Sequence, residues 1–108
     1  MPREVLGEFE LRVLLAAMRL NPDGYSVPIA LELEERTGKT VAGAAVHIAL
    51  QRLEKRGFLE SRLQPRPDGE KGRPRRHYTV TERGLLRAQD ARRCLEGLWK
   101  DLAMEAET

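Results

Sequence analysis

Arginine and lysine side chains gather between Arg62 and His77, a segment that we call the basic stretch. It holds six positive and two negative charges, a local net charge of +4, whereas the whole chain has 19 basic and 17 acidic residues and a net charge of +2. Clustered cations of this kind bind the phosphates of nucleic acids. A solvated loop that keeps the protein soluble is the alternative, and charge alone does not decide between them. The positive residues are Arg62, Arg66, Lys71, Arg73, Arg75 and Arg76.

Catalytic chemistry finds little support in the rest of the chain. His47 and His77 fall on different predicted elements, and no paired carboxylates, nucleophile motif or phosphate-binding loop accompanies them. Cys94 is the only cysteine, which excludes an intrachain disulfide and a cysteine-based zinc site. The spacing of His47, His77 and Cys94 matches no known metal cluster. We therefore expect no catalytic residue, no metal and no cofactor.

The length and composition predict one soluble, globular domain. With 33% charged and 41% hydrophobic residues, a chain of 108 residues can form a modest core without cross-links. No apolar run approaches the roughly 20 residues of a membrane span, and the first residues lack a signal-peptide pattern. We expect a cytoplasmic protein without membrane association.

Two short helices are predicted in the first third of the chain. The first runs from Glu8 to Leu20 and is marked by apolar residues at helical spacing, Leu11, Leu14, Leu15 and Met18, and the turn cluster at 21–24 ends it. Ser26 is the predicted N-cap of the second helix, and Gly38 ends it.

A third helix is predicted from about Val41 to Arg56, with Thr40 as its N-cap and Gly57 as the residue that closes it. A rotation of 100° per residue divides this helix into an apolar side and an opposite, more polar side. The apolar side consists of Ala42, Val46, Ala49, Leu50 and Leu53, and the opposite side of Ala44, Ile48, Gln51, Arg52 and Lys55, with His47 at its edge.

Two strands and a long helix complete the chain. Strands are predicted at 58–63 and 75–80, joined by a loop at 65–74 that is rich in proline and glycine. Thr81 is the predicted N-cap of a last helix of about twenty residues. Apolar residues repeat along it with spacings of 3, 4, 3 and 4, which is typical of helices that pair. This seam comprises Ala88, Ala91, Leu95, Leu98 and Leu102, and Leu85 and Trp99 widen it.

This order of elements predicts a mostly α fold with a small β-hairpin (α+β), namely a winged helix-turn-helix with a long C-terminal dimerisation helix. We expect residues 1–81 to form the DNA-binding domain and residues 82–108 to form the dimerisation helix packed on it. In such folds the third helix enters the major groove, and the hairpin, or wing, contacts the DNA backbone or the minor groove.

The third helix and the wing supply the candidate DNA contacts. Gln51 can pair bidentately with adenine and Ile48 can contact a thymine methyl group, whereas Arg52 and Lys55 suit phosphates. Thr40 would lie at a helix N-terminus, where backbone amides favour a phosphate. Taken singly these residues are typical of solvated surface, but their combination with the basic stretch favours DNA. The candidates are Thr40, Gly43, Ala44, His47, Ile48, Gln51, Arg52 and Lys55 on the helix, and Arg66, Lys71, Arg73, Arg75 and Arg76 on the wing.

Several motifs resemble the PadR-like transcriptional regulators. The most specific is GRPRRHYTVTERG at 72–84, which is similar to that family's wing and the start of its C-terminal helix. Shorter similarities are LGEFEL at 6–11, LEERTG at 33–38 and LQRLEKRGFL at 50–59. The resemblance implies a dimeric, DNA-binding repressor whose C-terminal helices form the dimer. A single such helix is similar to the smaller members, some of which bind flat aromatic compounds near the dimer interface.

The start of the third helix departs from the family's pattern. Ala42, Ala44 and His47 stand where the family usually has serine, glycine and tyrosine. Ala42 cannot cap a helix, so capping passes to Thr40 or is weaker, while His47 can still donate a hydrogen bond. The predicted fold is unaffected, but this segment becomes the least predictable part of the DNA contact.

The sequence therefore leads to one main hypothesis and one alternative. The main hypothesis is a homodimeric repressor that binds a double-stranded, inverted-repeat operator and pairs through its last helix. Trp99 is also the candidate contact for a small aromatic effector, although a tryptophan at such a position more often fills a core or an interface. The alternative is a winged-helix module that binds proteins and not DNA, for which five arginines and a lysine in the basic stretch would be unnecessary.

Overall fold

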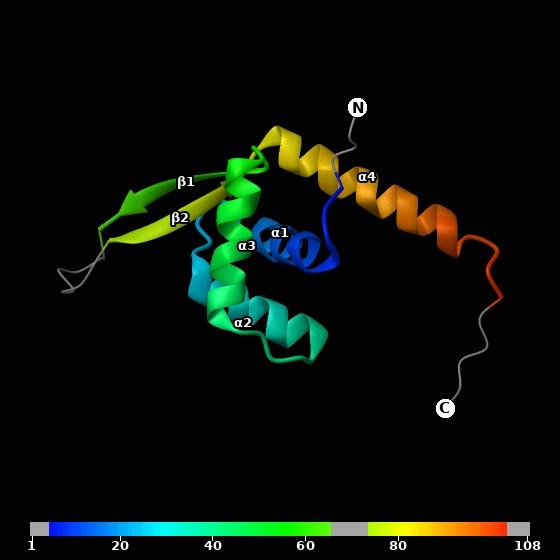
Figure 1. The fold of residues 1–108 in the computed structure, drawn as a ribbon, viewed down its shortest axis with the longest axis horizontal. Helices are drawn as coiled ribbons and strands as arrows, with labels where there is room; N and C mark the ends of the chain where they lie inside the picture. Colours follow the sequence, from blue (N-terminus) through cyan, green and yellow to red (C-terminus); the bar gives the residue numbers. More distant parts are fainter. Residues whose placement is uncertain (1–4, 66–73, 104–108) are drawn as a thin grey trace.

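The fold is described by a computed structural model that covers residues 5–65 and 74–103. Its elements are α1 (Glu8–Arg19), α2 (Ser26–Thr37), α3 (Gly43–Lys55), β1 (Leu59–Gln64), β2 (Arg75–Val80) and α4 (Glu82–Trp99). Figure 1 shows α1, α2 and α3 packed together, with the two strands projecting as a hairpin on one side and α4 running away on the other. The predicted α+β class and the winged helix-turn-helix order are confirmed.

Apolar stripes of the three short helices form the core. Leu14 of α1, Ile29 of α2, and Leu50 and Leu53 of α3 are all fully buried. These residues, which were predicted from their helical spacing, therefore face inward, because only one side of each helix can be shielded from water in a three-helix cluster. Leu15, which was predicted on the same stripe of α1, is instead exposed and lies beside α4.

The hairpin is anchored to the helices at its base. β1 and β2 pair in antiparallel fashion, with Ser61 opposite Tyr78. Tyr78 is buried, and its backbone amide donates a hydrogen bond to the carbonyl oxygen of Gly24 at 2.8 Å. The amide of Val80 donates to the side-chain oxygen of Asn21 at 3.0 Å. Since the turn before α2 thus binds the outer edge of β2, the base of the hairpin is held at a set angle to the helices.

Three predicted helix ends are confirmed. Gly38 and Gly57 have φ angles of 71° and 86°, the left-handed conformation in which a helix commonly ends. Thr81 is the N-cap of α4, and its side-chain oxygen accepts a hydrogen bond from the amide of Gly84 at 3.0 Å. These ends depend on local chain geometry, which is why the sequence reveals them.

Two predicted N-caps are wrong. Ser26 is the first residue of α2 and not its cap. Thr40 lies two residues before Ala42, the residue that precedes α3 and makes no side-chain capping bond. The amide of Val41 instead donates to the carboxylate of Glu34 at 2.9 Å. A side chain from the end of α2 therefore satisfies a backbone donor ahead of α3, and the helix begins two residues later than predicted.

α4 docks on the domain through its first half. A methyl group added at Gly84 would collide with the backbone of Phe58, so only glycine lets the helix approach this closely. Ala88, one turn further on, is buried. The helix ends at Trp99, and the following chain turns at Asp101, where φ is 60°. Leu102 therefore lies beyond the helix, and its predicted place on the helical seam is wrong.

Candidate nucleic-acid interface

One long side of α3 is open to solvent. Its residues are those that helical rotation placed away from the core, whereas Val46 and Leu50 on the opposite side are fully buried. We call this exposed side the outward face; it comprises Ala44, His47, Ile48, Gln51 and Lys55. Gly43, the first residue of the helix, is exposed next to it. Thr40 lies outside the helix, so its predicted place at the helix N-terminus is corrected.

Arg52 lies at one flank of the outward face and is tied to α1. Its Nη1 atom is 3.7 Å from Oε2 of Glu10, whose Oε1 accepts a hydrogen bond from Arg56 at 3.3 Å. Arg56 also donates to the backbone oxygen of Val5 at 3.1 Å. The Glu10 side chain is only 17% exposed, so two arginines compensate a carboxylate that has lost most of its water. The Arg52 side chain remains 68% exposed.

The other flank of the outward face meets the hairpin. The hydroxyl of Ser61 on β1 donates to Oε2 of Glu54 on α3 at 2.6 Å. Arg76 on β2 donates from Nη1 to the same Ser61 oxygen at 2.8 Å. A continuous chain of hydrogen bonds therefore joins the third helix to both strands.

The predicted wing residues lie on opposite faces of the hairpin. Successive side chains alternate along β2, so Arg75 and Arg76 point to different sides. The Arg75 guanidinium lies 4.6 Å from the ring centre of Tyr25, and the same ring lies 5.2 Å from that of His77. His77 also has Nδ1 within 3.0 Å of the carbonyl oxygen of Asp23. Arg75 thus packs at the start of α2, while Arg76 faces α3. Arg66, Lys71 and Arg73 lie outside the described residues.

Three residues of this surface were not among the sequence candidates: Glu10, Glu54 and Ser61. Ser61 carried a usable signal, because a hydroxyl at an inward strand position between Leu59 and Leu63 indicates a polar partner. Helical rotation places Glu54 beside the core but does not reveal which element faces it. Glu10 had no local signal, since its partners lie on α3 and at the residue that follows it, far along the chain.

The hydroxyl of Tyr78 is buried close to this network and has no hydrogen-bond partner. Burial raises the pKa of Tyr78, and the carboxylate of Glu54 raises it further, whereas Arg76 acts in the opposite direction. The phenol therefore stays neutral well above physiological pH. The charged groups that act on this phenol are Glu54 and Arg76.

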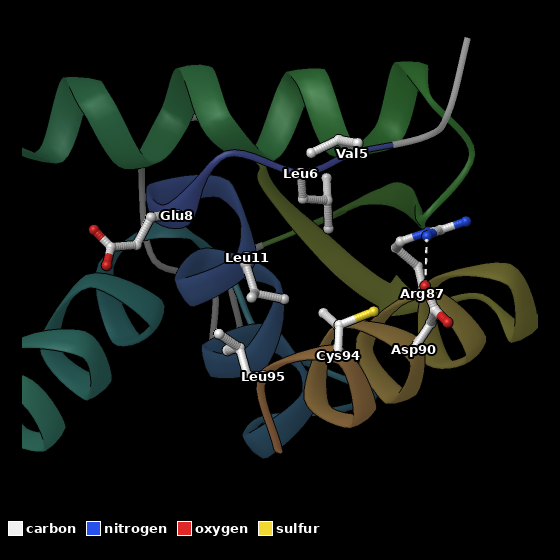
Figure 2. Close-up of a pocket in the computed structure, with 9 residues that line it drawn as sticks. Val5, Leu6, Glu8, Leu11, Arg87, Asp90, Cys94 and Leu95 are labelled. Atoms are coloured by element: carbon white, nitrogen blue, oxygen red, sulfur yellow. Dashed lines mark hydrogen bonds and ion pairs between the residues drawn. The ribbon is translucent and has the colours of Figure 1, made fainter. Parts of the chain in front are cut away.

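Two grooves run along α4, one on each side of Leu95. The first encloses about 450 Å³ between the segment before α1, α1 itself and α4. Figure 2 shows Leu11 and Leu95 lining it, with Arg87 paired to Asp90 at 3.1 Å on one side. The second encloses about 580 Å³ between α1 and α4. Its lining is mostly apolar and comprises Leu11, Leu15, Met18, Leu85, Ala88, Gln89, Arg92, Leu95, Glu96 and Trp99.

Part of the predicted seam is used inside the protomer, and the rest is uncovered. Ala88 is buried against the domain and Ala91 is partly buried in the first groove. Leu95 is half exposed, and Leu98 and Trp99 are 74% and 55% exposed. The second half of α4 therefore presents an apolar strip to solvent.

Metal and membrane chemistry gain no support from the described part of the chain. His47, His77 and Cys94 lie on α3, β2 and α4. Within residues 5–65 and 74–103, no group of three or more His, Cys, Asp or Glu side chains converges as a metal site. In the same ranges, no helix combines the length and the apolar character that crossing a membrane requires.

Comparisons with known proteins identify the family. No curated protein matches the sequence significantly. Structures with a similar fold include RosR of H. salinarum, with a TM-score of 0.70 and 21% identity over 93% of this chain and 83% of that one. A transcriptional regulator from Clostridium thermocellum has a TM-score of 0.68 and 22% identity, covering 84% of this chain and 85% of that one. A PadR family transcriptional regulator from Eggerthella lenta has a TM-score of 0.66 and 24% identity, covering 83% and 80%.

These structural likenesses establish the fold. The family itself follows from the sequence, because the pattern of the transcriptional regulator PadR-like family matches residues 14–90, which include α2, α3, the hairpin and the docked half of α4. That family consists of transcriptional regulators and not of enzymes. The chain therefore belongs to the PadR-like family of transcriptional regulators.

Proposed function

We propose that the protein is a cytoplasmic regulator that binds double-stranded operator DNA in a sequence-specific manner and represses transcription by occupying a promoter. The outward face of α3 is the observation that carries this proposal, because it is open to solvent and its flank is joined through Ser61 to Arg76 of the basic stretch. No core contact depends on these side chains, so they are free to meet DNA. Membership in a family of transcriptional regulators supports the same reading.

The outward face divides by chemistry into base-reading and phosphate-binding residues. Gln51 has the amide that pairs bidentately with adenine, and Ile48 offers an apolar contact for a thymine methyl group. Lys55 lies one turn beyond Gln51 and suits a phosphate. Arg52 reaches a phosphate by leaving its weak pairing with Glu10, since the two groups are 3.7 Å apart and Arg52 is largely exposed.

Base recognition and phosphate binding give different signatures in a DNA-binding assay. A duplex recovered by selection from a random library serves as the probe, and fluorescence anisotropy measures its affinity across a range of salt concentrations. Gln51→Ala should cost about 1–3 kcal/mol on the preferred duplex. It should cost little on a duplex in which the base pair contacted by Gln51 has been replaced. Lys55→Gln should weaken every duplex and reduce the salt slope by about one unit.

Lys100→Gln is the matched control, because Lys100 follows the far end of α4 and should leave the slope unchanged. Failure of the wild-type protein to select any duplex would reject the proposal. It would instead favour a winged-helix module that binds another protein.

We propose that the protein forms a homodimer through the apolar strip on α4. Leu98 and Trp99 are too exposed to serve the protomer's own core, and Leu15 of α1 extends the strip across the second groove. A second copy related by a two-fold axis would bury this surface in both chains. The same axis would present two α3 helices to successive major grooves, roughly 34–36 Å apart, and would require an inverted-repeat operator.

Two variants test the dimer. One introduces a charged side chain on the strip, and the other introduces it on the opposite side of the same helix. Leu98→Glu should give a monomer in analytical ultracentrifugation and weaken operator binding. Leu86→Glu is the control, because Leu86 is also exposed but points away from the strip by helical rotation. A Leu98→Glu protein that remains dimeric would refute the interface.

A small aromatic effector is proposed for the second groove. The groove is of ligand size at about 580 Å³, mostly apolar, and includes Trp99, whose flat ring suits stacking. Trp99 is the only tryptophan, so its fluorescence reports on this site alone. Planar aromatic compounds should quench that fluorescence and release the protein from DNA, whereas quenching without release would reject an effector role.

A further inference from the structure

We infer that Ser61 and Glu54 are positioning residues that hold the guanidinium of Arg76 for a DNA phosphate at the junction between α3 and the hairpin. This inference rests on the proposed function, since it assigns a role within DNA binding. It concerns a side chain that was expected to act simply as one of several wing cations.

The hydrogen bonds of the junction form an ordered chain. Arg76 Nη1 donates to the Ser61 oxygen at 2.8 Å, and the Ser61 hydroxyl donates onward to Glu54 Oε2 at 2.6 Å. The serine oxygen therefore accepts one bond and donates another, which fixes its rotamer at the centre of the chain. The guanidinium is planar and has five donors, so one bond to Ser61 leaves its remaining N–H groups available for a phosphate.

The fold places this chain of hydrogen bonds between α3 and the hairpin, the two elements that are proposed to face DNA. Ser61 is paired with Tyr78 across the strands, so Ser61, Tyr78 and Arg76 share the hairpin face that packs on α3. Glu54 lies at the edge of α3 next to this face. By contrast, Arg75 stacks on Tyr25 on the other face of the hairpin. Among the wing candidates that the structure describes, Arg76 is thus the one adjacent to the outward face of α3.

The charges at the junction explain how this chain of hydrogen bonds would assist DNA binding. An ionised carboxylate beside a DNA backbone repels phosphate, and Glu54 lies on the helix that is proposed to enter the groove. Arg76 compensates this charge through Ser61, so the junction carries no net negative charge that would repel the DNA. A guanidinium that is already oriented also loses less conformational freedom when it binds, which increases affinity.

A double-mutant cycle separates positioning from general stability. The probe is the fluorescein-labelled duplex selected by the wild-type protein, and anisotropy gives the affinity and the salt slope. Arg76→Gln should weaken binding and reduce the slope by about one unit. Ser61→Ala should weaken binding about threefold to tenfold while the slope is retained, because the cation remains but is no longer held.

The decisive comparison is Ser61→Ala in the Arg76→Gln background, where it should cause no further loss. Ser61→Thr keeps the hydroxyl and should restore wild-type affinity. Thr79→Val is the control, because Thr79 also carries a hydroxyl but donates it to the Pro22 carbonyl on the other hairpin face. Its effect on affinity should be small and independent of Arg76. Circular dichroism at the assay temperature confirms that each variant is folded.

Additive losses from Ser61→Ala and Arg76→Gln would overturn the inference, as would wild-type affinity in Ser61→Ala. Either result leaves the proposed function intact, provided that the wild-type protein binds the duplex in a salt-dependent manner. Absence of any such binding would instead reject the proposed function itself.

Discussion

Gly84→Ala tests how closely α4 must approach the domain. A methyl group at this position would meet the carbonyl oxygen of Phe58 well inside van der Waals distance, and Cγ1 of Val80 at 3.2 Å. The obstructing atom is backbone at the α3–β1 junction, so it cannot turn aside as a flexible side chain would. The helix must therefore move away from the domain.

The expected cost follows from what this movement disrupts. Overpacking a close contact costs about 1–3 kcal/mol. The Phe58 oxygen also accepts a hydrogen bond from the amide of Thr81 at 3.2 Å, and loss of such a bond costs about 1 kcal/mol. Alanine returns up to about 1 kcal/mol through its better helix propensity. A net destabilisation of about 1–3 kcal/mol remains, or a decrease of at least about 4 °C in Tm for a domain of this size.

Gly97→Ala is the matched control for this substitution. Gly97 lies in the same helix, and a methyl group there would have nothing within 4 Å. This variant should gain about 0.5–1 kcal/mol, because alanine favours the helix and nothing obstructs it. Both proteins are unfolded thermally at one fixed concentration, since oligomerisation makes Tm depend on concentration. A Gly84→Ala protein as stable as Gly97→Ala would refute the close docking of α4.

Substitutions at three further positions test the contacts around the interface and the docked helix. Tyr78→Phe removes a buried hydroxyl without a partner and should stabilise the protein by about 1 kcal/mol in urea denaturation. Because burial raises the pKa of Tyr78 in the folded state, the wild-type protein should lose stability as pH rises above 10, where the phenol of the unfolded chain ionises first. The phenylalanine variant should lack that part of the alkaline loss, and an identical pH profile for both proteins would contradict the assignment. Thr81→Ala removes the cap of α4 and a 2.7 Å bond to the Gly57 carbonyl, so it should cost about 1–2 kcal/mol, while Thr81→Ser should cost little. Glu10→Gln should destabilise the protein by about 1 kcal/mol at low salt and less at high salt, because it leaves Arg56 without its anionic partner. A salt-independent loss would show that packing of Glu10, and not its charge, is what matters.

Much of the fold was predictable because its signals are local. The apolar periodicity of α3, the left-handed glycines Gly38 and Gly57, and the capping hydroxyl of Thr81 each act within a few residues of the chain. The outward face of α3 was predictable for the same reason, since helical rotation alone separates exposed from buried positions. The prediction of Thr40 as a cap was wrong, because α3 begins two residues later than predicted and Glu34 of α2 binds the amide of Val41 ahead of the helix.

The sequence by itself determined which residues face the core, where most elements end, and that positive charge gathers in the basic stretch. Only the tertiary structure decided which partners the charged residues have. In the folded protein Arg75 packs on Tyr25, and Arg76 is linked to Glu54 through Ser61. Glu10 of the first helix pairs with Arg52 of the third. The physical reason is that periodicity and capping depend on neighbouring residues, whereas ion pairs and hydrogen-bond chains form between side chains that folding alone brings together.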